Sequence, residues 1–81
     1  MQIKYFAWIK DITLCDEEKL DDIKINDIEN LKLFLINKYP NLKKHIQQKI
    51  LRFAINKEYI SNNSNLKTDD EVAIFPPVSG G

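Results

Sequence analysis

The chain closes with Asp70-Glu71-Val72-Ala73-Ile74-Phe75-Pro76-Pro77-Val78-Ser79-Gly80-Gly81. Residues 71–75 alternate as a β-strand does, and we assign Val72 and Ile74 to the core. Phe75 then lies on the outer face beside the tail, where it is a candidate partner contact. The two prolines that follow fix φ and favour an extended path away from the domain. We therefore predict a folded domain over residues 1–75 and a flexible C-terminal diglycine tail over residues 76–81.

The diglycine gives this tail an end that can enter a narrow channel. Gly80 and Gly81 have no Cβ, so the terminal carboxylate is little hindered. Extended, the tail reaches at most about 20 Å, taking ~3.3–3.6 Å per residue, which would carry the carboxylate into a neighbouring protein's active site. The alternative is a frayed terminus. Fraying alone explains neither the paired prolines nor two glycines at the end.

The composition is that of one small globular domain. The 81 residues are 43% hydrophobic and 30% charged, enough for one modest core. Twelve basic and twelve acidic residues balance, so we expect no non-specific nucleic-acid binding, which depends on phosphate neutralisation. Acidic residues gather within 16–29 and basic residues within 43–52. Solvated faces are the simplest interpretation, and partner steering is the alternative.

One cysteine and one histidine argue against metal or nucleophile chemistry in this chain. Cys15 cannot form an internal disulfide, which fits a reducing compartment. Cys15 lies in a polar stretch expected to be exposed, and His45 is too isolated in sequence to suggest a zinc site or a nucleophile–base pair. No apolar run reaches the ~20 residues of a membrane helix, and the start lacks signal-peptide features. We expect a soluble, cytoplasmic protein without a metal or a membrane partner.

The first half of the sequence predicts two strands and a helix. Residues 3–10 alternate, with Phe6 and Trp8 on the outer face, covered either by a partner or by the domain itself. A turn then leads to a weak strand over residues 19–25. Asn26 can cap a helix, with Glu29 closing a capping box. Pro40 ends this helix, and its core-facing stripe consists of Ile28, Leu31, Leu35 and Tyr39.

The second half predicts a short helix, a hairpin and the last strand. The short helix lies within residues 41–51, with Ile46 and Ile50 facing inward. Residues 52–55 and 59–60 are two strands joined by a turn. A polar loop over residues 61–65 follows, and Leu66 anchors the chain before the final strand. A hairpin followed by a helix across one sheet face is the β-grasp plan of ubiquitin-like domains. The expected fold class is α+β, a mixed sheet with one main helix packed across it.

Within that class, the run from Asp70 to Gly81 resembles the end of the molybdopterin synthase small subunit, the MoaD-like sulfur carrier. That family ends in an acidic residue, Glu-Val-Ala, an apolar pair, Pro-Pro-Val, a small residue and Gly-Gly. Two shorter matches are Phe6-Ala7-Trp8-Ile9-Lys10-Asp11, similar to Phe-Ala-x-x-Arg-Glu, and Ala54-Ile55-Asn56, similar to a Val-Asn hairpin. Lys10, in place of the family's Arg, lacks the planar guanidinium that can form two parallel hydrogen bonds to a carboxylate. Asp69 stands where relatives commonly have the Gly of a turn.

The resemblance implies that Gly81, preceded by Gly80, is the reactive end. An ATP-using adenylyltransferase of the ubiquitin-activating type would form an acyl-adenylate on the Gly81 carboxylate, and a sulfur donor would convert it to a thiocarboxylate. The thiocarboxylate would pass its sulfur to cyclic pyranopterin monophosphate, building the molybdopterin dithiolene in molybdenum cofactor biosynthesis. ATP belongs to the activating enzyme, and this chain would bind no cofactor of its own.

The resemblance also implies a partner that holds the active site. The large subunit of molybdopterin synthase would contact Phe75, Pro76, Pro77, Val78 and Ser79, in a heterotetramer of two small and two large subunits. This chain would be the sulfur-donating, non-catalytic subunit of a sulfurtransferase. Two alternatives share the diglycine: a sulfur carrier for thiamine thiazole synthesis, which usually lacks Pro-Pro-Val here, and a ubiquitin-like protein modifier.

Overall fold

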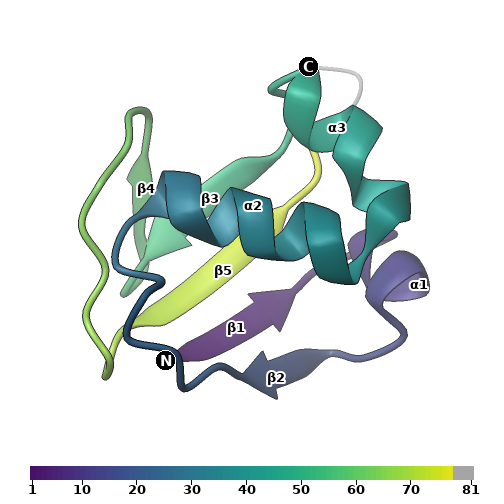
Figure 1. Ribbon diagram of the computed structural model, residues 1–81. Helices are drawn as coiled ribbons and strands as arrows, with labels where there is room; N and C mark the ends of the chain where they lie inside the picture. The colour runs from purple at the N-terminus through teal and green to yellow at the C-terminus, as the bar shows by residue number, and fades with distance from the viewer. Residues whose placement is uncertain (78–81) are drawn as a thin grey trace.

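The computed structural model describes residues 1–77, which form a five-stranded mixed sheet with helices on one face (Figure 1). The elements in order are β1 Gln2–Tyr5, α1 Ile9–Thr13, β2 Glu17–Lys19, α2 Ile28–Lys38, the 3-10 turn η1 Pro40–Leu42, α3 Lys43–Gln47, β3 Arg52–Ile55, β4 Glu58–Ile60 and β5 Glu71–Phe75. The strand order is β2-β1-β5-β3-β4, with β1 and β5 parallel and the other neighbours antiparallel. This is the β-grasp arrangement, so the expected α+β fold class is confirmed.

The core lies between the sheet and α2, which crosses it in Figure 1. Leu31 and Leu35 of α2 and Val72 and Ile74 of β5 are completely buried, as the two periodicities predict. Burying side chains of this size contributes about 1.5–3 kcal/mol each, before the entropy of ordering the chain is subtracted. Tyr39, the fourth member of the predicted stripe, follows α2 and is half-buried.

The first strand is shorter than its alternation predicts. β1 ends at Tyr5, and the chain turns through Ala7, which has a positive φ of 55°. Helix α1 then occupies Ile9–Thr13, where the sequence suggested the end of a strand and a turn. Ile9 is fully buried in this helix, so tertiary packing overrides an alternation that fits strand and helix alike over so few residues.

The second strand also lies elsewhere than its sequence predicts. β2 is Glu17–Lys19, earlier than the expected residues 19–25, and Ile23 is 83% exposed. Glu18 stands opposite Ile3 of β1, whose side chain is fully buried. The pairing therefore turns Glu18 toward the core side, and a carboxylate that the sequence assigned to a solvated face becomes 14% exposed.

Asp27, the residue after the expected cap, begins α2. Its carboxylate accepts a hydrogen bond from the Asn30 backbone N–H at 2.7 Å, as an N-cap does. The backbone carbonyl of Asn26 instead accepts a hydrogen bond from the Leu66 backbone N–H at 2.8 Å. The Glu29 N–H donates to the side chain of Asn63 at 3.0 Å. The start of α2 is thus tied to the loop before β5, a contact that no local capping pattern reveals.

The elements of the second half are confirmed in kind. The predicted short helix is the turn η1 followed by α3, with Ile46 buried and Ile50 half-buried. Residues Asn56 and Lys57 join β3 to β4 with positive φ values of 49° and 72°, which suit a two-residue hairpin turn. Leu66 is buried, as expected of an anchor.

Candidate functional site

An aromatic patch made of Phe6, Tyr59 and Phe75 lies on the face of the sheet away from α2. The rings of Phe6 and Phe75 stack with centroids 4.4 Å apart, and the Tyr59 ring lies 5.7 Å from that of Phe75. Phe6 is 39% exposed and Tyr59 72% exposed. Rings that are stacked but still open to solvent offer a preformed apolar surface, the kind that commonly anchors a partner protein.

Strand register explains why these three residues meet. Phe75 alternates outward because Val72 and Ile74 face the core. The Phe6 N–H donates to the carbonyl of Ile74 at 3.1 Å, which holds Phe6 against the end of β5. Tyr59 was predicted only as a strand residue; its pairing with Ala54 across the hairpin puts it on the same face.

Small residues leave space between the rings. Ala54 of β3 stands opposite Ala73 of β5, and a hollow of about 340 Å³ lies over them, rimmed by the aromatic patch and by Lys4 and Glu71. The ammonium of Lys4 and the carboxylate of Glu71 are 3.1 Å apart. An apolar centre with a charged edge is typical of a protein–protein contact surface.

The tail leaves directly from this patch. A second hollow, of about 600 Å³, is lined by Phe6, Tyr59 and Phe75 together with Pro76 and Pro77. Pro76 is half-buried and Pro77 exposed. Neither can donate a backbone N–H, so strand pairing ends at Phe75.

Of the predicted site residues, Phe75, Pro76 and Pro77 are thus brought together. Val78, Ser79, Gly80 and Gly81 lie outside the residues that the structure describes.

Trp8 does not share the outer face with Phe6. After the turn at Ala7, the indole of Trp8 packs on the ring of His45 in α3, with centroids 4.7 Å apart. This contact joins the segment before α1 to α3, so the domain itself partly covers Trp8. The sequence left open whether the domain itself or a partner covers Phe6 and Trp8. Within the domain, His45 packs on Trp8, whereas Phe6 stays on the exposed aromatic patch.

Neither a reactive cysteine nor a metal site is evident in the described part of the chain. Cys15 is half-buried, contrary to the expected exposure, and packs against the core near Tyr39. No cluster of three His, Cys, Asp or Glu side chains suited to a metal occurs within residues 1–77. Over the same residues, no helix is long and apolar enough to cross a bilayer. What the described part of the chain offers is a surface.

A partly buried hydrogen-bond cluster supports β1, the strand that ends just before Phe6. Glu18 accepts from the hydroxyls of Tyr5 and Tyr39, the latter at 2.6 Å, and from the Lys38 ammonium at 2.5 Å. Burial alone would raise the pKa of Glu18, but these donors outweigh it and lower the pKa below its ordinary value. Burial, together with the neighbouring Glu18 carboxylate, raises the pKa of both tyrosines.

A second carboxylate holds the start of β5. Asp70 is 8% exposed and accepts hydrogen bonds from the Lys67 N–H and the Asn56 side-chain amide, both at 2.8 Å. These two donors lower the pKa of Asp70. The Asn56 side chain also accepts from the Glu71 N–H at 2.9 Å. The hairpin turn and the start of the last strand are therefore joined by polar contacts that the sequence reasoning missed.

The two departures from the family pattern have mild consequences. The Lys10 ammonium lies 3.9 Å from an Asp16 carboxylate oxygen, a long and largely exposed ion pair that contributes at most about 1 kcal/mol. Asp69 is not among the non-glycine residues with positive φ. The turn into β5 therefore does not require a glycine.

The fold and the patch define a class: a ubiquitin-like β-grasp domain with an exposed aromatic patch at the end of its last strand. Comparison with known proteins gives the family. The pattern of the ThiS family matches residues 3–81, and the chain belongs to this family.

Two similar proteins carry the name molybdopterin synthase sulfur carrier subunit. The one from Chlamydomonas reinhardtii is 35% identical, with both chains covered in full. The one from Dictyostelium discoideum is 33% identical over 99% of this chain and 94% of its own.

Two solved structures share the fold along nearly the whole chain. The small archaeal modifier protein 1 of Methanosarcina acetivorans has a TM-score of 0.81 at 29% identity, covering 99% of this chain and 94% of its own. The complex of subunits 1 and 2 of the molybdopterin-converting factor of Helicobacter pylori contains a chain with a TM-score of 0.70 at 28% identity, covering 99% and 96%.

Proposed function

We propose that this chain is the sulfur carrier subunit of a molybdopterin synthase. The observation that carries the proposal is full-length similarity to proteins of that name, together with an aromatic patch at the point where the diglycine tail departs. The patch docks the domain on the large subunit, and the tail presents Gly81 to the large subunit's active site. The molybdopterin-converting factor complex of Helicobacter pylori supports a partner of this kind.

The proposed chemistry takes place at the Gly81 carboxylate. A carboxylate resists nucleophiles, so an adenylyltransferase first joins it to AMP from ATP, releasing pyrophosphate. A sulfur donor then displaces AMP, and the thiocarboxylate formed is a strong, soft nucleophile. Its sulfur forms a bond to a side-chain carbon of cyclic pyranopterin monophosphate as an oxygen substituent leaves that carbon, and water then cleaves the resulting thioester, which returns Gly81 to a carboxylate and leaves the sulfur on the pterin. Two such transfers complete the dithiolene. The chain positions the sulfur, while the acid–base and oxyanion-binding groups belong to the partners.

Mass spectrometry and reconstitution test the proposal together. The full chain, incubated with the adenylyltransferase, ATP and a sulfur donor, should gain the mass of an oxygen-to-sulfur exchange at Gly81. The product, mixed with the large subunit and cyclic pyranopterin monophosphate, should yield molybdopterin. Omitting ATP is the control. A chain that never acquires sulfur, or acquires it and supports no molybdopterin synthesis, contradicts the proposal.

A second candidate function is protein modification. The similarity to a small archaeal modifier protein favours it, because that relative shares the fold at 29% identity. A modifier would form an isopeptide between Gly81 and lysines of target proteins. Immunoblots of cells expressing the tagged full chain would then show a ladder of conjugates that disappears on deletion of Gly81. The thiamine alternative is distinguished by supplying the thiocarboxylated chain to a thiazole synthase.

A further inference from the structure

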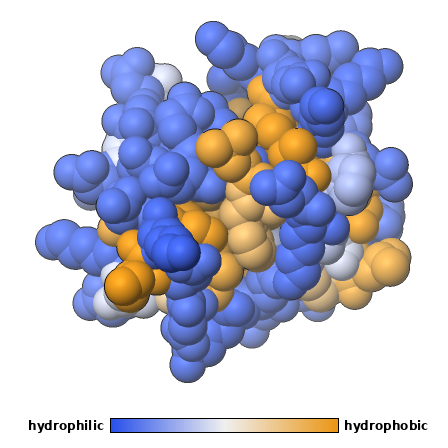
Figure 2. Space-filling view, viewed as in Figure 1, coloured by the Kyte–Doolittle hydropathy of each residue, from blue (hydrophilic) through white to orange (hydrophobic). Residues whose placement is uncertain are grey.

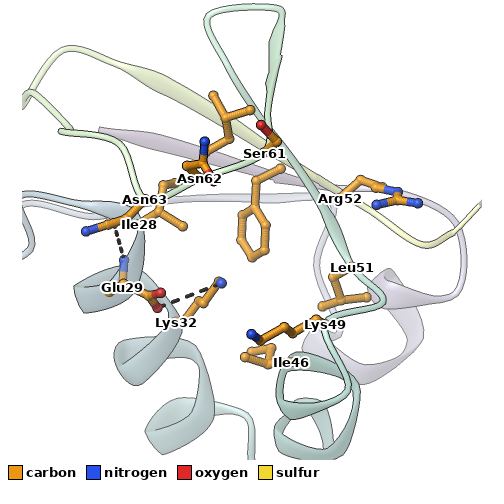
Figure 3. Close-up of a pocket in the computed structure, with 12 residues that line it drawn as sticks. Ile28, Glu29, Lys32, Ile46, Lys49, Leu51, Arg52, Ser61, Asn62 and Asn63 are labelled. Carbon is orange, nitrogen blue, oxygen red and sulfur yellow. Dashed lines mark hydrogen bonds and ion pairs between the residues drawn. The ribbon is translucent and has the colours of Figure 1, made fainter.

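A groove on the helix-bearing face takes no part in the proposed sulfur chemistry. Its volume is about 360 Å³, and it lies between the first half of α2, the end of α3 and the β3–β4 side of the sheet (Figure 3). Ile46 and Phe53 line its apolar side, and Ser61 and Asn62 lie at the loop end. Figure 2 shows apolar side chains gathered near the middle of this face between hydrophilic flanks. We call this feature the basic groove, because of the charges described next.

Positive charge dominates the basic groove. Lys32, Lys49 and Arg52 line it against a single carboxylate, that of Glu29, which lies 3.8 Å from the Lys32 ammonium. Neither Lys49 nor Arg52 forms an ion pair with a carboxylate of residues 1–77. The local charge is thus positive in a chain whose net charge is zero.

The two lysines converge on one space. In Figure 3, the side chains of Lys32 and Lys49 point toward one another, whereas the Arg52 guanidinium points away from them. Arg52 stands opposite Phe75 in the pairing of β3 with β5, so its side chain leaves the sheet on the side of the aromatic patch. Ammonium groups directed at the same space repel each other, and an anion placed between them removes that repulsion. Lys49 follows α3 with a φ of 58°, in the left-handed region that glycine usually occupies after a helix. Lysine is conformationally less favourable than glycine at such a position.

The lining favours a peptide over a nucleotide. A base needs an open aromatic face for stacking, whereas Phe53 is only 6% exposed and the Lys32 ammonium lies 5.7 Å above its ring. The hydroxyl of Ser61 and the amide of Asn62 instead suit the backbone groups of an extended chain. Arg52 also lines the hollow beside Pro76, so a protein seated on the aromatic patch can continue into the groove.

We propose that the basic groove binds a short acidic segment of a partner protein. One apolar side chain of that segment contacts Ile46 and Phe53, and its carboxylates pair with Lys32 and Lys49. Binding here does not involve Gly81. Deletion of Gly81 therefore leaves peptide binding intact while it abolishes sulfur transfer, and the two proposals fail separately.

The test is a nuclear magnetic resonance titration of the full chain. The probe is a peptide with a central leucine flanked by aspartates, and the same peptide with asparagines is its control. The acidic peptide should shift the backbone amides around Lys32, Phe53 and Asn62. The double variant Lys32→Gln with Lys49→Gln should bind about tenfold more weakly, because both partly exposed ion pairs with the peptide are lost. Lys44→Gln, in α3 but outside the groove, is the matched control and should bind as the unchanged chain does.

Four outcomes would overturn the proposal. Absence of shifts in these amides excludes the site. Equal weakening by Lys44→Gln shows non-specific attraction. Stronger shifts with inorganic phosphate or ATP than with the peptide assign the groove to a small anion. Shifts of the same amides on raising the chain's own concentration, without peptide, assign it to the acidic segment of a second copy.

Discussion

At the scale of single residues, Glu18 connects three parts of the molecule. It lies in β2 and accepts hydrogen bonds from Tyr5 in β1 and from Lys38 and Tyr39 at the end of α2. A carboxylate with three donors can stay ionised although it is mostly buried. The weakly paired edge strand β2 is thereby held to the helix, and Tyr5 is held just before Phe6 of the aromatic patch.

Glu18→Gln should destabilise the domain by about 1–3 kcal/mol. The amide keeps the shape but replaces charge-assisted hydrogen bonds with weaker ones and brings donors of its own toward the Tyr5 and Tyr39 hydroxyls. Urea unfolding followed by circular dichroism measures the change. Glu17→Gln, in the same strand but exposed, should stay within about 0.5 kcal/mol. Equal changes in the free energy of unfolding for the two substitutions would show that the hydrogen-bond cluster around Glu18 does not stabilise the domain.

The lowered pKa values of Glu18 and Asp70 predict loss of stability in acid. A carboxyl group whose folded pKa lies below its unfolded value, about 4.3 for Glu and 3.9 for Asp, stabilises the fold above that value and ceases to do so as the pH falls through the folded pKa. The raised pKa of Tyr5 has the opposite sign: its contribution is complete below about pH 10 and is lost above it.

Melting temperatures measured from about pH 2 to about pH 11 test both the loss of stability in acid and the loss in alkali, because this range spans the ordinary pKa values of carboxyl groups and tyrosine. In the variant that combines Glu18→Gln with Asp70→Asn, the melting temperature should fall less steeply below about pH 4.5. An unchanged acid slope would mean that other carboxyl groups control acid unfolding.

At the scale of elements, β5 serves two surfaces at once. Its inward residues Val72 and Ile74 are completely buried, while Phe75 stacks on Phe6. Its neighbours β1 and β3 are paired along its length, so the strand next to the tail is central and rigid. A tail that leaves from such a strand starts from a well-defined position, which suits delivery of its end to a partner.

Phe75→Ala should weaken binding to the large subunit more than it lowers the melting temperature. Phe75 is half-buried and lies outside the core, and an aromatic anchor at an interface commonly accounts for about 2 kcal/mol or more, a loss of at least about thirtyfold in affinity. Isothermal titration calorimetry with the large subunit measures this. Leu33→Ala, at a residue of α2 that is 60% exposed, is the control and should bind normally. Unchanged affinity of the Phe75 variant would remove the patch from the interface.

At the scale of the whole molecule, we expect the domain to determine stability and the tail to carry the proposed chemistry. Among the described residues, the buried core consists of side chains between Met1 and Ile74, and the proposed chemistry belongs to Gly81. Folding and sulfur transfer should therefore respond to different changes in the chain.

Deleting Gly81, or adding one alanine after it, should abolish molybdopterin synthesis while the melting temperature stays within about 4 °C, because changes outside the core usually alter stability by at most about 0.5 kcal/mol. Reconstituted synthesis and calorimetry on the same samples test this. Alanine in place of Lys43, an exposed residue at the start of α3, controls for handling and should retain synthesis. Molybdopterin formed by the chain without Gly81 would refute the carrier proposal.

Local pattern sufficed for the class of fold, the stripe of α2, the β3–β4 hairpin and the inward face of β5. These follow from the periodicity of neighbouring side chains, which depends on no distant contact. It did not suffice at residues 6–13, where alternation continued but packing of Ile9 favoured a helix. Nor did it reveal the buried roles of Glu18 and Asp70, because charged residues are usually exposed.

Long-range pairing settled those points and assembled the site. Phe6, Tyr59 and Phe75 are far apart in sequence, and they meet because β1 and β3 both pair with β5 while β4 pairs with β3 in a specific register. Shifting a strand by one residue would reverse which face each side chain occupies. The chemistry proposed for the tail could thus be inferred from consecutive residues, whereas the surface that would present it depends on contacts between distant ones.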